Sequence, residues 1–307
     1  MSDKAPSRPG FGLAMAVSFV LIWAGWIIAT RYAVQTSMTP AGVAIIRFCV
    51  AALFFLPWYW REGVLPKGVD RRLLFTMVVC AGVPYLLIVS SGMAFAPAAD
   101  IGALLPGTLP LFTAILGWVV IKETMEPPRI LGFVFIACGI ILIAGPAVLF
   151  GADGAWRGHF LFLFGAFMWS IFTHAFKKTG LGSLQAAGLI GFWSLALVIP
   201  LVIFTGGGGL LSLSWQELGY QAVVQGFFGG MLSLVTYGLA VVHLGATRAA
   251  AFGSLVPALV ALLAIPLLGE IPGWITGLAI GAITMGVLLA SGQGAPILRR
   301  IRSNLTI

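Results

Sequence analysis

Few side chains in this 307-residue chain could do chemistry inside its long apolar runs. Arg47 and His174 lie well inside such runs, and Asp100 lies near the start of another. An ionisable side chain is costly in the interior of a bilayer, so a residue placed there is a functional candidate by default. Because these residues make no convergent catalytic set, the sequence favours a binding or transport protein over an enzyme.

Arg47 has two possible roles. It lies about seven residues into its apolar run, so its head group could reach only part of the way to the membrane surface. The guanidinium could pair with the carboxylate of a substrate. It could instead pair with a backbone carbonyl or with an acid at a helix end, and thereby hold the helices together. The second, structural role is favoured, and the first stays open.

The histidines also leave alternatives open. His174 lies inside an apolar run, where it could line a cavity and bind substrate or carry a proton, because histidine titrates near neutral pH. A hydrogen bond to a neighbouring helix would explain it equally simply. His243 lies close to the end of its run, where an interfacial, solvated histidine is expected.

One apolar run has a polar stripe. Gln221, Gln225, Gly229, Ser233 and Tyr237 recur every four residues and therefore share one face of a helix. That face either packs against a neighbouring helix through its small residues or lines an aqueous pathway. Gln225 and Tyr237 favour the pathway, because both are large for a tight packing contact.

Several aromatic residues lie deep in apolar runs, namely Trp23, Trp26, Tyr85, Trp169 and Trp193. Most such residues are core or lipid-facing bulk. Trp23 and Trp169 are favoured as cavity residues because they occupy matching positions in two halves of the chain, as shown below. A pocket walled by aromatic rings would suit an aromatic side chain or an organic cation.

The composition predicts a membrane protein. Hydrophobic residues make up 60% of the chain and charged residues 8%, against about 25% charged in soluble proteins. The net charge of +8 comes from short basic clusters between apolar runs, which is a topology signal and not a nucleic-acid site. Three isolated cysteines and the absence of a GxxxxGK[ST] run predict no metal, no cofactor and no ATP site.

The apolar runs predict an all-α polytopic membrane protein, since about 20 apolar residues span a bilayer. The ten expected spans are 11–33, 41–60, 73–94, 98–121, 129–149, 157–177, 184–204, 217–241, 247–268 and 273–292. With the N-terminus in the cytoplasm, 14 of the 17 Lys and Arg residues lie on the cytoplasmic side. Both termini are therefore expected there, and no cleavable signal peptide is expected.

The chain contains an internal duplication. Four positions recur at a constant offset of 147 residues, namely Asp100 and Thr247, Pro110 and Pro257, Glu123 and Glu270, and Gly139 and Gly286. Trp23 and Trp169 extend the match, because each has a basic residue eight positions later, Arg31 and Lys177. Each unit holds five spans, an odd number, so the second unit enters the membrane from the opposite side. Secondary transporters commonly use such inverted repeats.

The duplicated polar residues have structural interpretations. Asp100 and Thr247 are good N-cap residues at the start of a helix. Capping is favoured for Asp100 over binding of a substrate ammonium group. Glu123 and Glu270 lie in tight turns, where each carboxylate is expected to face the N-terminus of the following helix.

The matched prolines Pro110 and Pro257 are hinge candidates. A proline inside a helix removes a backbone hydrogen bond and weakens the helix locally. A static kink is nearly as good an explanation for any one proline, but the matched pair favours a moving part.

Trp23, Arg47 and the doubled proline–glutamate–glycine run together resemble the drug/metabolite transporter superfamily, EamA type, over nearly the whole chain. Within it the chain is most similar to YddG-like aromatic amino acid exporters. The resemblance implies a pseudosymmetric fold in which spans 1–4 and 6–9 line a central cavity. The second unit departs from the pattern, because Ile190 stands at the position that matches Arg47.

The expected function is a secondary transporter in the bacterial inner membrane that exports small molecules by alternating access. Its expected cargo is aromatic and other neutral amino acids, with related metabolites such as methyl viologen. The alternatives are a multidrug carrier for flat organic cations and a passive pore. The expected organisation is a cytoplasmic tail (1–10), two repeats (11–150 and 157–292) and a basic tail (293–307). The expected partners are small-molecule substrate and lipid, without nucleic acid or ATP, and the protein is expected to be a monomer.

Overall fold

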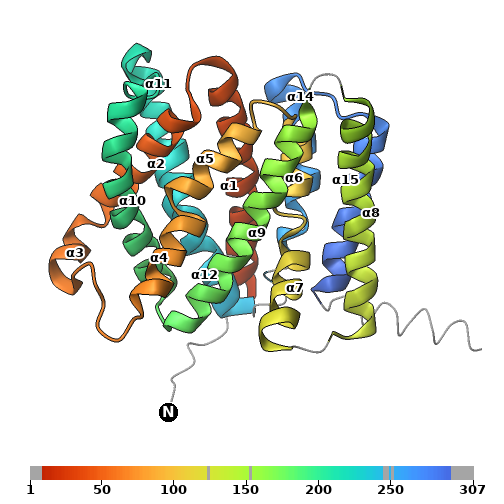
Figure 1. Cartoon of the computed structure of the whole chain (residues 1–307), viewed down its shortest axis with the longest axis horizontal. Coiled ribbons are helices and arrows are strands. Elements are labelled where there is room, and N and C mark those ends of the chain that lie inside the picture. Colours follow the sequence, from red (N-terminus) through yellow and green to blue (C-terminus); the bar gives the residue numbers. More distant parts are fainter. Residues whose placement is uncertain (1–8, 123–124, 152–153, 245–248, 250–251, 292–307) are drawn as a thin grey trace, which may run out of the picture.

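The computed structural model describes residues 9–122, 125–151, 154–244, 249 and 252–291. Every regular element in these ranges is a helix (Figure 1). The predictions for both tails, for Glu123 and for Thr247 fall outside the described residues.

The first half of the chain forms eight of the described helices. They are α1 (Pro9–Thr36), α2 (Pro40–Phe54), α3 (Leu56–Glu62), α4 (Arg71–Ala81), α5 (Val83–Gly92), α6 (Ala98–Leu104), α7 (Leu109–Ile121) and α8 (Pro127–Phe150). The predicted spans 73–94 and 98–121 are each divided in two, as α4–α5 and α6–α7.

The second half has a similar course. Its described elements are α9 (Ala155–Thr179), α10 (Ser183–Thr205), the short η1 (Leu210–Ser212), α11 (Trp215–Gln221), η2 (Ala222–Leu232), α12 (Ser233–Leu244), α14 (Val256–Leu268) and α15 (Trp274–Ala290). The segment η2 is π-helical, a rare geometry that is often found at functional sites.

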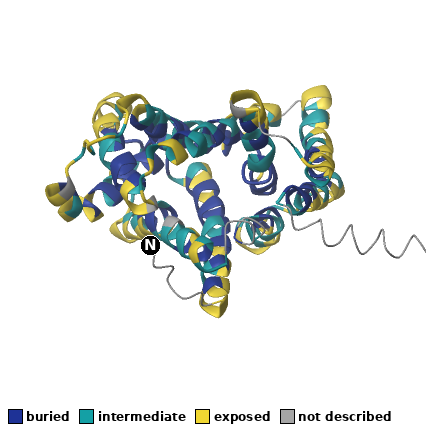
Figure 2. Ribbon diagram, turned by 90° about the horizontal axis from the view of Figure 1, so that it is seen from below, coloured by how far each residue is buried: buried dark blue, intermediate teal, exposed yellow. Residues whose placement is uncertain are grey.

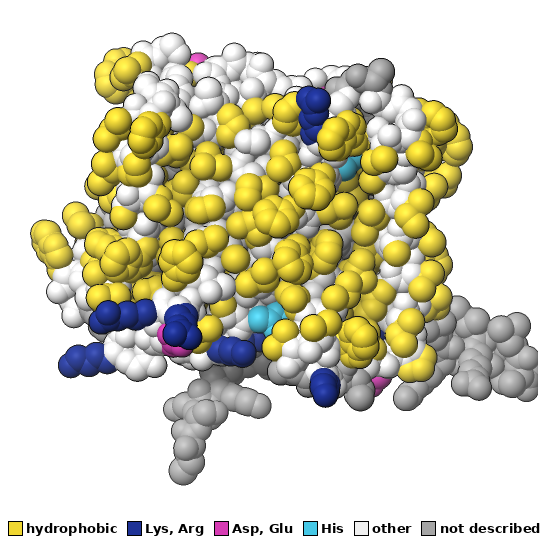
Figure 3. Space-filling model, in the orientation of Figure 1, with side chains coloured by type: hydrophobic (Ala, Val, Ile, Leu, Met, Phe, Trp, Pro, Cys, Tyr) yellow, Lys and Arg dark blue, Asp and Glu magenta, His cyan; other side chains and the backbone are white. Residues whose placement is uncertain are grey.

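The lengths of the helices fit a membrane protein. Within the described residues, seven helical segments are long and apolar enough to cross a membrane. Three shorter apolar helices, α2, α14 and α15, lie at the remaining predicted spans. Figure 3 shows hydrophobic side chains over the middle of one face and most Lys and Arg side chains along its lower edge. In Figure 2, buried residues lie where helices face one another and exposed ones lie on the outer rim.

The two hinge prolines lie at corresponding breaks. Pro110 is in the first turn of α7, after the non-helical turn at 105–108. Pro257 is in the first turn of α14, after a turn at 254–255. Proline is tolerated at the start of a helix because its missing N–H has no partner to lose there. Whether the chain bends at these breaks during function stays a prediction.

The duplicated glycines, Gly139 and Gly286, explain why one pair of helices packs closely. Helices α8 and α15 lie side by side at one edge of the molecule (Figure 1). A Cβ atom on Gly286 would lie 2.6 Å from the Gly132 carbonyl oxygen, and Gly139 is equally crowded by Ile283. Small residues at these positions let the two backbones approach closely, as is usual between helices in lipid.

Candidate functional site

The candidate site is built around Arg47 on α2. Its Nη2 atom donates a hydrogen bond of 3.0 Å to the Gly229 carbonyl oxygen on η2. The centre of its guanidinium lies 5.0 Å from the Trp26 ring centroid, within cation–π range. Its Nη1 atom is buried and has no hydrogen-bond partner among the residues that the structure describes. Arg47 therefore makes one hydrogen bond and one cation–π contact, and its buried Nη1 group is left without a partner among the described residues.

Gly229 is what allows this arrangement. A Cβ atom at that position would lie 2.6 Å from Trp26 Cδ1 and 3.1 Å from Arg47 Nη1. The Gly229 carbonyl also accepts a bond of 2.8 Å from the Ser233 hydroxyl. A larger residue would push the ring and the guanidinium away from η2.

The polar stripe of the eighth predicted span is mostly used for packing. Gln225 accepts a bond of 3.1 Å from the Thr30 hydroxyl on α1, and its amide donates to Gln221 at 3.3 Å. Both glutamine side chains are fully buried. In this conformer Gln225 joins η2 to α1. This is the packing role that the sequence left open beside a role in an aqueous pathway.

Aromatic rings link the two halves of the chain at two places. Trp23 on α1 lies 5.2 Å from Phe19, which in turn lies 4.9 Å from Tyr237 on α12. Tyr85 on α5 lies 5.2 Å from Trp169 on α9.

Helix α5, which carries Tyr85, packs against α2, which carries Arg47. Tyr85 contacts Trp169, and Arg47 contacts Trp26, so these two contacts lie on neighbouring helices. We call Trp26, Arg47, Tyr85 and Trp169 the central cluster. The predicted residue Trp23 lies in the other aromatic group, with Phe19 and Tyr237.

His174 makes a local contact. Its Nδ1 atom lies 2.9 Å from the Ser170 carbonyl oxygen, one turn earlier on the same helix. The Ser170 hydroxyl lies 3.3 Å from the Thr113 hydroxyl on α7. This bond of His174 is to its own helix, whereas the structural interpretation of the sequence expected a bond to a neighbouring helix.

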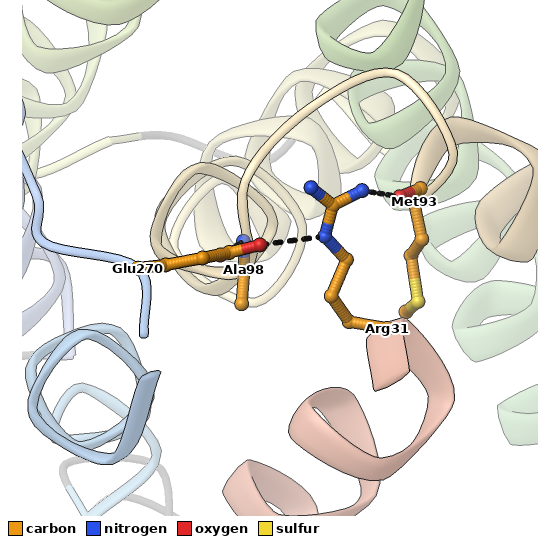
Figure 4. A network of polar contacts seen from close by, with 4 residues as sticks. All are labelled: Arg31, Met93, Ala98 and Glu270. Atoms are coloured by element: carbon orange, nitrogen blue, oxygen red, sulfur yellow. Dashed lines mark hydrogen bonds and ion pairs between the residues drawn. The ribbon is translucent and has the colours of Figure 1, made fainter. Parts of the chain in front are cut away.

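A polar network joins four separate segments at one end of the molecule. Arg31, near the end of α1, donates from Nε to Glu270 at 2.8 Å and from Nη1 to the Met93 carbonyl oxygen (Figure 4). The other oxygen of Glu270 accepts a bond of 2.7 Å from the Ala98 amide. Arg31, Met93, Ala98 and Glu270 are called the latch below.

The latch corrects two predictions from the sequence. The N-cap position of α6 is held by Pro97, and Asp100 lies three residues further on. The Glu270 carboxylate meets the N-terminus of α6, not that of the following helix α15. A carboxylate at a helix N-terminus satisfies a free amide and the helix dipole. The side chain of Pro97 cannot accept a hydrogen bond from a backbone amide. The Glu270 carboxylate, from the other half of the chain, accepts the bond from the Ala98 amide instead.

Asp100 has a different partner. Its carboxylate lies 2.7 Å from Nε2 of His159, near the start of α9. Both side chains are almost fully buried. Nothing in the sequence distinguishes His159, because it lies near one end of a predicted span, where a solvated histidine is ordinary.

The comparisons with known proteins agree on the class of protein. The profile of the EamA-like transporter family matches residues 10–145 and 156–292. An "Uncharacterized transporter YyaM" from Bacillus subtilis (strain 168) is 26% identical over 280 residues, covering 83% of this chain and 85% of that protein. A solved structure titled "Crystal structure of protein" is similar with a TM-score of 0.62 at 14% identity, covering 94% of this chain and 99% of the other. That likeness shows a shared fold. The paired matches to one family over most of the length show that this chain belongs to the EamA-like transporter family.

Proposed function

We propose that this EamA-family protein is a secondary transporter that exports aromatic and other neutral amino acids by alternating access. The observation that carries the proposal is the central cluster. It combines a guanidinium whose Nη1 donor is buried and has no partner among the described residues with the rings of Trp26, Tyr85 and Trp169. A guanidinium is suited to a carboxylate, and aromatic rings are suited to an aromatic side chain.

Packing of the helices supports an inverted repeat of five spans each. Helix α1 packs on α12, and in the corresponding positions α9 packs on α4 and α5. The pairs α2 with α10 and α8 with α15 each join matching elements of the two halves, and α6 with α14 joins parts of two matching spans, 98–121 and 247–268. This is the pattern that a pseudo-two-fold axis in the membrane plane produces. In such transporters the substrate lies between the two repeats, where the central cluster also lies.

Orientation follows from the positive-inside rule. With the N-terminus in the cytoplasm, α1 ends on the outer side, so the latch lies there too. The conformer is then closed toward the outside by contacts between Glu270 of the second repeat and residues of the first. Export requires these contacts to separate.

The central cluster favours amino acids over organic cations. Its charged group is itself a cation, Arg47, which would repel a positively charged cargo in a poorly solvated site. The acid that a cation carrier would need, Asp100, is already bonded to His159. A passive pore is the remaining alternative, and it differs from a carrier because its flux does not saturate.

The test is counterflow of labelled phenylalanine, tryptophan and threonine in proteoliposomes. We expect saturable exchange that unlabelled amino acids inhibit and that phenethylamine, which lacks the carboxylate, does not. A hydrogen bond to a charged group contributes about 1.5–3 kcal/mol. Arg47→Gln should therefore lower the apparent affinity by about tenfold to a hundredfold.

The matched control is Cys49→Ala, a change two residues away on the same helix, which should leave exchange unchanged. If no amino acid is taken up specifically, the proposed function is wrong. If phenethylamine competes as well as phenylalanine, Arg47 does not bind the carboxylate.

A further inference from the structure

We propose that Asp100 and His159 form a proton-binding site that couples proton entry to export of the substrate. The inference rests on the transport function and membrane orientation proposed above. It concerns a buried pair of titratable groups that substrate recognition by Arg47 does not use.

The geometry leaves one proton acceptor on His159. The distance of 2.7 Å between Nε2 and the Asp100 carboxylate is that of a strong hydrogen bond. An ionised carboxylate can only accept, so Nε2 carries the hydrogen and Nδ1 of a neutral imidazole has a lone pair. Nδ1 is buried and has no hydrogen-bond partner in the described part of the chain. It is the atom at which a proton would bind.

The charge of the pair gives the direction of the effect. With a neutral imidazole the pair has a net charge of −1. One added proton forms an N–H bond at Nδ1 and brings the net charge to zero. Burying an uncompensated charge is expensive, whereas a neutral hydrogen-bonded ion pair is less so. The exposed fractions of Asp100 and His159 are 7% and 3%, so protonation stabilises the closed conformer in which they are buried.

Other charged groups at this end have partners or are exposed. Within the described residues, the titratable or charged side chains at this end of the helices packed on α6 and α9 are Arg31, Tyr32, Arg157 and Glu270. Arg31 and Glu270 neutralise each other in the latch. Tyr32 is exposed, and the Arg157 guanidinium lies over the Phe95 and Trp156 rings, at 5.9 and 5.6 Å from their centroids. The hydrogen bonds and ring contacts that Arg31, Arg157 and Glu270 make within the described residues do not involve Asp100 or His159.

Helix α6 connects the pair to the latch. Glu270 holds its first residue, Ala98, and His159 holds Asp100 two residues further on. The helix ends at Leu104 and is followed by the break before α7. If the latch opens on the outer side, the start of α6 separates from Glu270 and the pair meets outer water.

A transport cycle follows from these contacts. A proton from the outside binds Nδ1 of His159 after the substrate has left. The neutral pair is buried again as the latch closes, and the proton leaves to the cytoplasm in the inward-open state. One proton enters for each amino acid exported.

Two transport measurements test the site. Counterflow at equal pH on both sides involves no net proton movement, whereas accumulation driven by a pH gradient does. We expect the wild-type protein to accumulate substrate against its gradient when protons flow the opposite way. His159→Gln and Asp100→Asn should each lose at least tenfold of this driven accumulation, while counterflow continues. The matched control is Arg157→Gln, which removes an exposed charge from the same turn of α9 and should keep both activities.

Proton binding is also measured without substrate. On a pH step, purified wild-type protein in detergent should take up one proton more than His159→Gln does. The same difference should appear with Asp100→Asn, in which His159 is retained and the fold can be checked by size-exclusion chromatography. An equal proton uptake by wild type and both variants overturns the proposal, and so does gradient-driven accumulation that survives in His159→Gln. Loss of wild-type counterflow contradicts the proposed transport function instead, and the proton count still decides the role of the pair.

Discussion

Residues in this protein take their roles from contacts between the two halves of the chain. Arg31, Arg47 and Asp100 belong to the first repeat, and their partners Glu270, Gly229 and His159 belong to the second. The sequence indicates which residues are unusual in lipid but not which of them meet. For Glu270 the partner lies 172 residues away, at Ala98.

Removing Glu270 should open the outer end of the protein. Glu270→Ala leaves the charge of the buried Arg31 side chain without its partner, which destabilises the closed conformer, and it also frees the Ala98 amide. In a variant without native cysteines that carries Ala99→Cys on α6, we expect an impermeant maleimide to react at least tenfold faster once Glu270 is replaced.

The matched control for this change is Thr36→Ala, which removes an exposed hydroxyl near the same end of α1. It should leave the labelling rate unchanged. Equal labelling of the Glu270→Ala protein and its parent would show that the latch does not close the outer side.

The helices of this protein are positioned by close packing of their backbones and by breaks between helical segments. The recurring Gly139 and Gly286, which mark the repeat in the sequence, lie in the contact between α8 and α15. The recurring Pro110 and Pro257 lie in the first turns of α7 and α14, each of which follows a break in the helix. Periodicity and proline placement therefore predicted where elements lie, while the π-helical turn η2 has no signal of comparable strength in the sequence.

Gly286→Leu should destabilise the pair of α8 and α15. Its Cβ atom would lie 2.6 Å from the Gly132 carbonyl oxygen and 2.7 Å from Ile136 Cγ1. Overpacking costs about 1–3 kcal/mol, so we expect a lower thermal unfolding midpoint in detergent.

Gly281→Leu on the same helix is the control, since a Cβ atom there meets nothing within 4 Å. It should be neutral or slightly stabilising, because leucine is a better helix former than glycine. If the two variants unfold at the same temperature, close approach of the backbones does not explain the duplicated glycine.

The whole molecule is organised by its membrane and its repeat. The basic side chains gather along one edge of the face in Figure 3, and large exposed hydrophobic side chains cover the helices between the two ends. The proposed inverted repeat requires the links after α8 and before α4 to lie on opposite sides of the bilayer.

The orientation can be tested with single cysteines. In a variant whose Cys49, Cys80 and Cys138 are replaced, Arg157→Cys should react with an impermeant maleimide added outside intact cells. Lys67→Cys should react only after the membrane is permeabilised. Labelling of Lys67→Cys from outside would reverse the proposed topology, and with it the outer position of the latch.

The sequence by itself determined the class of this protein. A chain with 60% hydrophobic and 8% charged residues cannot cover a water-exposed surface, and the constant offset between its repeated positions marks a duplication. Composition and repeat spacing are properties of the sequence alone, so they can be recognised without knowing which segments are in contact.

The tertiary structure decided which polar groups meet. It joins Glu270 to the start of α6, puts Pro97 at the N-cap position that the sequence assigned to Asp100, and pairs Asp100 with a histidine that the sequence left unremarked. The physical reason is that a polar group in lipid must find its partner within the protein. Which partner it finds depends on how the two repeats pack against each other, and that is set by contacts between residues far apart in the chain.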